Sequence, residues 1–291
     1  MTVLVFLDPA HEAGRVADAS RPQLMATDLG ATRGDGIFES LLAVNGVPRK
    51  LRAHLDRLAG SARAMDLQLP SQDAWERAIA TAIAEHPPAE ELVIKLLVTR
   101  GVEGSPAPTA WVQASLPPAA GRRQRTDGIS VLLLDRGYDS SLAERAPWLL
   151  MGAKTLSYAV NMAALRYAHK NGADDAIFTS SDGRVLEGPT STVLMARVRD
   201  GVKTLVTPLL ESGILPGTSQ SALFKAAEAA GWQLGYGPLE PHDLYEADAV
   251  WLVSSIRLLA PVKSIDGKEI PVSPNLTQEL TALLAQGSQE E

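Results

Sequence analysis

The stretch from Pro147 to Glu187 constrains the fold more than any other part of the chain. Lys154 lies within it, after seven residues that carry no charge. Most lysines lie in polar, solvated surroundings, because burying an unpaired ammonium is costly. A desolvated lysine loses its proton more easily, and its amine can then act as a nucleophile or a base. Lys154 is therefore a candidate catalytic residue. The alternative is a lysine with a buried stem and a solvated amine.

The residues after Lys154 predict a helix and then a hairpin. A helical period runs from Tyr158 to Lys170, and a strand is predicted from Asp174 to Thr179. A polar turn and a second short strand follow, and this second strand ends at Glu187. One helix and one hairpin thus separate the amine from the carboxylate in sequence. An ordinary turn glutamate is the alternative for Glu187.

Composition limits the classes of protein to which the chain can belong. Its 291 residues are 45% hydrophobic and 21% charged, the balance of a globular protein with a sizeable core. The net charge of −7 is not the excess of positive charge that binding to nucleic acid or an anionic membrane requires. The absence of cysteine excludes disulfides and thiolate metal sites, and is compatible with a reducing cytosol. We expect a cytoplasmic protein without a secretory leader or membrane span. We expect no metal site, because the five histidines show no paired ligand spacing.

The first part of the chain predicts a small domain. An Asn45-Gly46 turn between two strand-like runs predicts a hairpin. Apolar residues spaced by three and four predict a helix from Leu51 to Leu67, and Ser71 is expected to cap the next helix. The run from Pro117 to Arg125 is typical of a linker. We therefore expect a small N-terminal α+β domain over residues 1–118 and a larger C-terminal domain over residues 119–291.

A predicted helix start after Gly217 is a second informative stretch. The helix is expected to run from Thr218 or Ser219 to Ala230, with the small hydroxyl residues as its N-cap. Free N–H groups and hydroxyls at a helix start can bind a phosphate, and plain capping explains them equally well. A last helix is predicted over Leu276 to Leu284, followed by a frayed tail from Gln286 to Glu291.

Six short motifs follow one another along the chain. They are Gly34-Asp35-Gly36-Ile37-Phe38-Glu39, His54-Leu55-Asp56-Arg57-Leu58, Lys154 with its helix, Leu186-Glu187-Gly188, Gly213-Ile214-Leu215-Pro216-Gly217-Thr218 and Ser254-Ser255. Each motif alone is weak, but the ordered set resembles the class IV aminotransferases, the fold type IV pyridoxal-phosphate enzymes. The resemblance implies a mixed α/β (α+β) fold of two domains, like that of D-amino-acid transaminases. It also implies a homodimer, with pyridoxal 5'-phosphate (PLP) at the domain interface.

The resemblance assigns a role to each matching position. Lys154 would hold PLP covalently and move protons as general acid and base, and Glu187 would face the pyridine nitrogen. Leu215 would pack against the ring face, and Tyr158 would lie near the ring hydroxyl. The residues expected to bind the phosphate are Arg57, Gly217, Thr218, Ser254 and Ser255.

Three kinds of function are compatible with these motifs. Within the family, the run from Lys154 to Met162 is most similar to aminodeoxychorismate lyases. These enzymes convert 4-amino-4-deoxychorismate to 4-aminobenzoate and pyruvate in folate biosynthesis. A D-amino-acid or branched-chain transaminase is the alternative, and a non-catalytic cofactor-binding protein is the third possibility.

Two departures from the transaminase patterns favour the lyase. The loop after Arg100 lacks the further Arg and His that D-amino-acid transaminases typically use to bind the substrate carboxylate. Ser254-Ser255 stands where branched-chain enzymes usually carry a Gly-Thr-Ala-Ala-Glu-like run. The loop also lacks the Arg and Tyr that some lyases use. Arg100 itself is the candidate for binding a substrate carboxylate, and a structural arginine at a strand end is the alternative.

Overall fold

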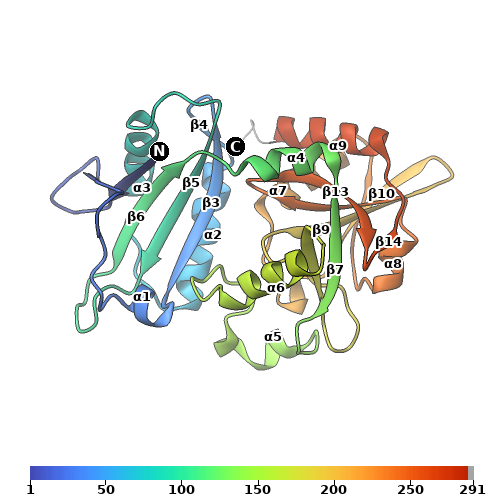
Figure 1. The fold of residues 1–291 in the computed structure, drawn as a ribbon, viewed down its shortest axis with the longest axis horizontal. Coiled ribbons are helices and arrows are strands. Elements are labelled where there is room, and N and C mark those ends of the chain that lie inside the picture. The colour runs from blue at the N-terminus through green and yellow to red at the C-terminus, as the bar shows by residue number, and fades with distance from the viewer. Residues whose placement is uncertain (288–291) are drawn as a thin grey trace. The chain divides into compact units, whose positions relative to one another are not determined.

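The computed structural model describes residues 1–287, and its contacts divide the chain into two compact units (Figure 1). The first unit comprises Met1–Pro118 together with Ala153–Tyr158. Of the described residues, the second comprises Ala119–Gly152 and residues 159–287. Each unit has its own sheet and helices, so the expected mixed α/β fold is confirmed. The segment that carries Lys154 belongs by its contacts to the first unit, although it follows residue 118 in sequence.

The first unit is built on a six-stranded antiparallel sheet in the order β2-β1-β6-β5-β3-β4. Its strands are β1 (Thr2–Phe6), β2 (Arg15–Ala17), β3 (Gly36–Val44), β4 (Val47–Pro48), β5 (Glu91–Thr99) and β6 (Thr109–Ser115). Its helices are α1 (Leu29–Arg33), α2 (Leu51–Ala64) and α3 (Gln72–Ala84). The predicted Asn45-Gly46 hairpin joins β3 to β4, and Ser71 caps α3 by accepting the N–H of Ala74.

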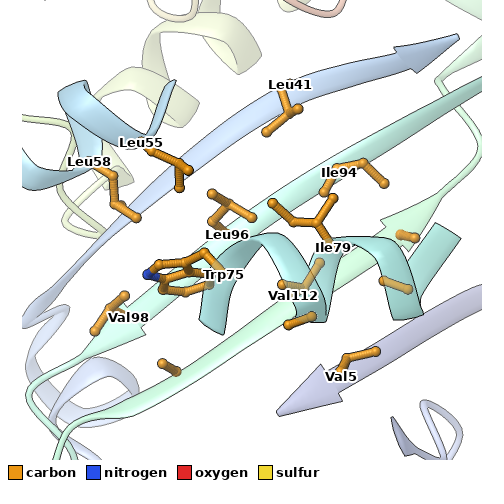
Figure 2. Packing of buried hydrophobic residues seen from close by; sticks show 14 of the residues in the cluster. Val5, Leu41, Leu55, Leu58, Trp75, Ile79, Ile94, Leu96, Val98 and Val112 are labelled. Atoms are coloured by element: carbon orange, nitrogen blue, oxygen red, sulfur yellow. The ribbon is translucent and has the colours of Figure 1, made fainter. Parts of the chain in front are cut away.

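Helices α2 and α3 pack against the sheet of the first unit and form its core (Figure 2). Leu55 and Leu58 of α2 and Trp75 and Ile79 of α3 point toward Leu41, Ile94, Leu96 and Val112 of the strands. Strand side chains alternate between the two faces of a sheet. Ile37, Glu39 and Leu41 are therefore on one face of β3, and all three are fully buried. A carboxylate thus lies among the apolar side chains that face α2.

The second unit is built on an eight-stranded mixed sheet in the order β11-β10-β9-β12-β13-β7-β8, with β14 paired to β13. Its strands are β7 (Ile129–Asp135), β8 (Asp175–Thr179), β9 (Thr192–Arg199), β10 (Val202–Pro208), β11 (Gln233–Gly237), β12 (Ala249–Ser254), β13 (Leu258–Ile265) and β14 (Lys268–Glu269). Its helices are α4 (Ala119–Asp127), α5 (Leu142–Arg145), η1 (Pro147–Leu149), α6 (Ala159–Lys170), η2 (Leu210–Ser212), α7 (Thr218–Ala229), α8 (Pro241–Tyr245) and α9 (Pro274–Gly287).

Strand β12 lies at the centre of this unit and is buried on both faces, which is why it is apolar along its length. Val250 and Leu252 belong to the core on one face. Trp251 and Val253 belong to the core on the other face, with residues of α7 and α9. Helix α7 thus packs against this face of the sheet. The N-terminal end of α7 carries part of the candidate site.

Several predicted elements differ from the structure. The expected linker from Pro117 to Arg125 is wrong in part, because most of it forms α4. The helix expected to end at Leu67 ends at Ala64, and the last helix extends to Gly287, beyond which the expected tail lies outside the described residues. No helix among residues 1–287 is both long and apolar enough to span a membrane.

Candidate active site

Lys154 lies beside β3 in the first unit, in a segment that pairs with this strand through a single β-bridge. Strand β4 pairs only with the end of β3, at Ala43 and Val44. The start of β3 pairs with the lysine segment instead, through a bridge between Ile37 and Thr155. The N–H of Phe38 donates to the carbonyl of Lys154 at 3.0 Å, and the N–H of Lys154 donates to Ser61 Oγ at 3.0 Å. Both backbone polar groups of the lysine are therefore tied to secondary structure.

The amine of Lys154 lies against two aromatic rings. Phe38 is the cross-strand neighbour of Lys154, so their side chains lie on the same face. The Nζ atom is 4.2 Å from the centroid of the Phe38 ring and 5.4 Å from that of Tyr158. The two rings meet edge to face at 5.2 Å. This places Lys154 and Tyr158, two of the predicted site residues, close together, and the side chain of Lys154 is half-buried.

A buried charge cluster stands on the other face of β3. The carboxylate of Glu39 accepts the Nε–H of Arg57 at 2.7 Å and an Nη2–H at 2.9 Å. It also bonds His54 Nδ1 at 2.7 Å. His54 and Arg57 are three residues apart on α2, so one helix face supplies both partners. Arg57, predicted to bind the phosphate, is thus oriented by Glu39 through two of its five N–H donors.

The protonation states of this cluster follow from burial and charge. Burial alone would raise the pKa of Glu39, but the Arg57 charge and the hydrogen bonds from His54 and Arg57 outweigh it. The pKa of Glu39 therefore lies well below its ordinary value. Burial lowers the pKa of His54 below 6.5, although Glu39 opposes this, and the nearby Arg57 and Lys50 add to the lowering. Glu39 is then ionised and His54 neutral near neutral pH, with the proton on Nδ1 donated to the carboxylate.

Arg100 has structural contacts within the first unit. Its Nε–H donates to Asp35 at 2.7 Å, and its Nη groups donate to the carbonyls of Met65 and Asp66 at 2.7 and 3.2 Å. The hydrogen bond to Asp35 raises the pKa of the guanidinium, which stays charged. These contacts are those expected of a structural arginine at a strand end, the alternative considered from the sequence.

In the second unit, Glu187 and Leu215 lie together. The N–H of Leu215 donates to Glu187 Oε2 at 3.0 Å. Arg136 Nη1 lies 3.8 Å from Glu187 Oε1, and its guanidinium stacks 4.5 Å from the Phe178 ring centroid. Glu187 ends a hairpin whose backbone bonds to Phe178, although only a bridge and no second strand forms there. A backbone N–H and a guanidinium thus lie at the two oxygens of this carboxylate.

The N-terminal end of α7 has the features of a phosphate site. The predicted N-cap is wrong: Gly217 is the cap residue, and no side chain caps the helix. Thr218 and Ser219 are buried, and their hydroxyls bond Ser255 Oγ at 3.1 and 3.2 Å. A Cβ on Gly217 would lie 2.5 Å from Thr192 Oγ1, so a side chain does not fit there. A cradle of helix N–H groups and three hydroxyls suits a phosphate anion.

Ser254 is adjacent to this cradle, but its hydroxyl has another partner. Ser254 Oγ accepts the N–H of Arg257 at 3.2 Å and so closes the turn between β12 and β13. Arg125 of α4 donates to the carbonyls of Ile256 and Arg257, both at 2.9 Å, and fixes the same turn. Among residues 1–287, no group of acidic or histidine side chains is placed to hold a metal ion.

The sequence reasoning missed several residues that contact the predicted ones. Phe38, Glu39 and His54 stand in the quoted motifs, but the sequence assigns no role to any of them. Ser219 adjoins Thr218 in the sequence and shares its bond to Ser255. Ser61 and Arg136 carry no local signal, because their contacts depend on residues far away in the chain.

Comparisons with known proteins identify the family of the chain. A family model described as amino-transferase class IV matches residues 36–265. A bifunctional aminodeoxychorismate lyase / D-amino acid transaminase of Mycobacterium tuberculosis (strain ATCC 25618 / H37Rv) is 46% identical over 266 residues, which are 90% of this chain and 92% of the relative. A structure described as a hypothetical aminotransferase from Mycobacterium tuberculosis in its PLP-bound form is 42% identical, with a TM-score of 0.92 over 100% of this chain and 99% of that one. Its form with alpha-ketoglutarate and PMP also has 42% identity and a TM-score of 0.92, over 99% of this chain and 100% of that one.

Proposed function

The chain belongs to the class IV aminotransferases, a family of PLP enzymes, and from this premise we propose that it is an aminodeoxychorismate lyase. It would convert 4-amino-4-deoxychorismate to 4-aminobenzoate and pyruvate, with transamination of D-amino acids as a second activity. The relative at 46% identity over 90% of the chain carries this proposal, because it is named for both reactions. A D-amino-acid or branched-chain transaminase alone is the competing function.

We assign the chemistry to residues of both units. When bound, PLP accepts the electron pair of a carbanion that forms beside the substrate amine. Lys154 Nζ would bind the cofactor and carry the proton that leaves and returns in the reaction. The ionised Glu187 would keep a proton on the pyridine nitrogen. The two rings beside Nζ support this role for Lys154, because they give the amine an apolar surface on one side.

The remaining residues would bind and orient the cofactor. The proposed phosphate ligands are Arg57, the N–H groups that follow Gly217 and the hydroxyls of Thr218, Ser254 and Ser255. Leu215 would pack on the ring, and Tyr158 would lie near the ring hydroxyl. Ser255 is supported better than Ser254, because Ser255 bonds Thr218 while Ser254 closes the turn. Arg100 remains the candidate for a substrate carboxylate, but the assignment of the reaction does not depend on it.

A product assay separates the two reactions. A transaminase needs a keto acid for every second half-reaction, whereas a lyase turns over repeatedly without one. We expect the purified protein to form 4-aminobenzoate and pyruvate from aminodeoxychorismate over many turnovers with no keto acid, and Lys154→Ala to form neither. Absence of both products, together with rapid exchange between D-alanine or leucine and 2-oxoglutarate, would establish the transaminase instead.

We further propose that the enzyme acts in the cytoplasm as a homodimer. The absence of cysteine is compatible with a reducing compartment. The dimer is the assembly that the family resemblance implies. Sedimentation velocity of the purified protein tests it, because one chain has a mass of 30.9 kDa and a dimer would sediment at twice that mass.

A further inference from the structure

Ser61 lies in the last turn of α2, which ends at Ala64. A serine hydroxyl in a helix often bonds a nearby backbone group of its own helix. Ser61 is only 4% exposed, so its hydroxyl must find a partner inside the protein. The bond that the structure gives it is not local: Ser61 Oγ accepts the N–H of Lys154, 93 positions away in the chain.

The position of Ser61 on α2 relates it to Arg57. Residues four apart lie one turn apart on the same helix face, about 6 Å along the axis. Arg57 and Ser61 have this spacing, and His54 lies on the same face. This polar stripe runs beside the apolar stripe of Leu55 and Leu58, which packs into the core. One rigid helix therefore bonds both the charge cluster at Glu39 and the backbone of Lys154.

From this geometry we propose that Ser61 is a positioning residue that fixes the backbone of Lys154 to α2. Ser61 would set the distance between the lysine amine and Arg57. It would do so without contacting the amine or the guanidinium. This proposal rests on the proposed function in one respect: the distance matters because Lys154 and Arg57 would bind the same cofactor. The strand pairing at Phe38 holds the carbonyl of Lys154, and Ser61 holds the N–H, so each fixes a different half of the peptide.

The first test measures amide hydrogen exchange at single residues in the cofactor-free protein, comparing wild type with Ser61→Ala. Removing the acceptor leaves the N–H of Lys154 without its partner, so we expect its exchange to accelerate about tenfold. Ser71→Ala is the matched control, because it removes another hydroxyl that accepts a backbone N–H in the same unit. Equal acceleration in both variants would indicate a general loss of stability and would overturn the proposal.

The second test measures how fast the cofactor-free protein captures PLP on Lys154, followed by absorbance and by mass mapping after borohydride reduction. We expect capture to be several-fold slower in Ser61→Ala and unchanged in Ser71→Ala. Faster exchange at Lys154 with unchanged capture would mean that Ser61 holds the backbone but does not position the amine, which would also overturn the proposal. If wild type captures no PLP, the proposed function fails, whereas the exchange experiment still reports on Ser61.

Discussion

Single side chains in the first unit make stability depend on pH. Burial is the main reason why the pKa of His54 lies below its ordinary 6.5. As pH falls below that value, the unfolded chain binds a proton at this residue and the folded protein does not. The free energy of unfolding therefore decreases as the pH decreases, because the unfolded state binds more protons. The window begins near pH 6.5 and extends down to the lowered pKa of the folded state.

His54→Asn should remove part of this dependence. Its amide N–H can replace the Nδ1–H that bonds Glu39, but it does not titrate. We expect the variant to lose less stability than wild type between about pH 7.5 and about pH 5.5. Urea unfolding at both values measures the difference. An identical loss in both proteins would mean that the pKa of His54 is the same in the folded and unfolded states.

Arg57→Ala should affect stability as well as cofactor binding. It leaves Glu39 buried without its cationic partner, and breaking a buried pair in this way costs about 3 to 5 kcal/mol. We expect a lower free energy of unfolding in the cofactor-free variant, and loss of PLP on dialysis. Adding Glu39→Gln should recover stability, because position 39 then carries no buried charge, but it should not recover PLP retention. Recovery of both would remove Arg57 from the proposed phosphate ligands.

Glu187→Gln should slow turnover while PLP is still captured on Lys154. A neutral amide cannot hold a proton on the pyridine nitrogen by charge, although it can still accept the N–H of Leu215. We expect kcat of the cofactor-saturated variant to fall about 100-fold, the usual scale for removing one electrostatic group at a reaction centre. Normal turnover would show that Glu187 does not face the ring nitrogen.

The sequence could predict the residues of the site better than their partners. Lys154 and Glu187 stand in recognisable motifs, but the role of Glu39 depends on the face of β3 that meets α2. That face follows from strand pairing, which local sequence does not encode. The contacts of Arg100 show the same limit, because two of its three acceptors are carbonyls at the end of α2.

At the scale of elements, α2 carries a glycine that its fold does not need. A Cβ on Gly60 would have only the end of the Arg63 side chain nearby, at 3.8 Å. Gly60→Ala should stabilise the protein by about 0.5 to 1 kcal/mol, because alanine loses less conformational freedom in a helix. Gly46→Ala is the control: it also has room for a Cβ, but its φ of +79° strains any side chain, so it should destabilise. Urea unfolding of both variants checks the opposite signs.

Helix α4 shows why some elements escape prediction. It buries no residue, so it has no apolar period. Its Gly and Arg content, directly after Pro117 and Pro118, is typical of a linker. Arg125 ties it instead to two carbonyls of the β12–β13 turn, more than 130 positions away. The N-cap of α7 was wrong for a related reason. Helix α7 begins at Thr218, so Gly217 takes the cap position, and Thr218 and Ser219 inside the helix bond Ser255 instead.

At the scale of the molecule, chain order and contacts disagree at one place. The main segment of the first unit ends at Pro118. The six residues from Ala153 to Tyr158 nevertheless return to the first unit, because the open start of β3 binds their backbone. A single boundary in the sequence cannot describe a segment that returns to the first unit. The division by contacts separates the predicted site residues: Lys154, Tyr158 and Arg57 belong to the first unit, and Glu187, Thr218 and Ser255 belong to the second.

This division leads to a prediction about the whole chain. If one PLP uses groups from both units, its binding should stabilise both. Mass action raises the stability of a binding-competent state by about 2.7 kcal/mol when the free ligand is 100 times its dissociation constant. We expect added PLP to slow amide exchange in β3, reported by Phe38, and in α7, reported by Ser221, whose N–H donates to Gly217. Both reporters lie in regular structure next to a proposed ligand.

The control for this experiment is Lys154→Ala, which lacks the covalent attachment. It should weaken the protection of β3 more than that of α7, because the proposed phosphate ligands at α7 remain. Slower exchange in only one unit of the wild-type protein would contradict the assignment. The residues of the unprotected unit would then have no contact with the cofactor, and either the Lys154 group or the Glu187 and Thr218 group would have to be reassigned.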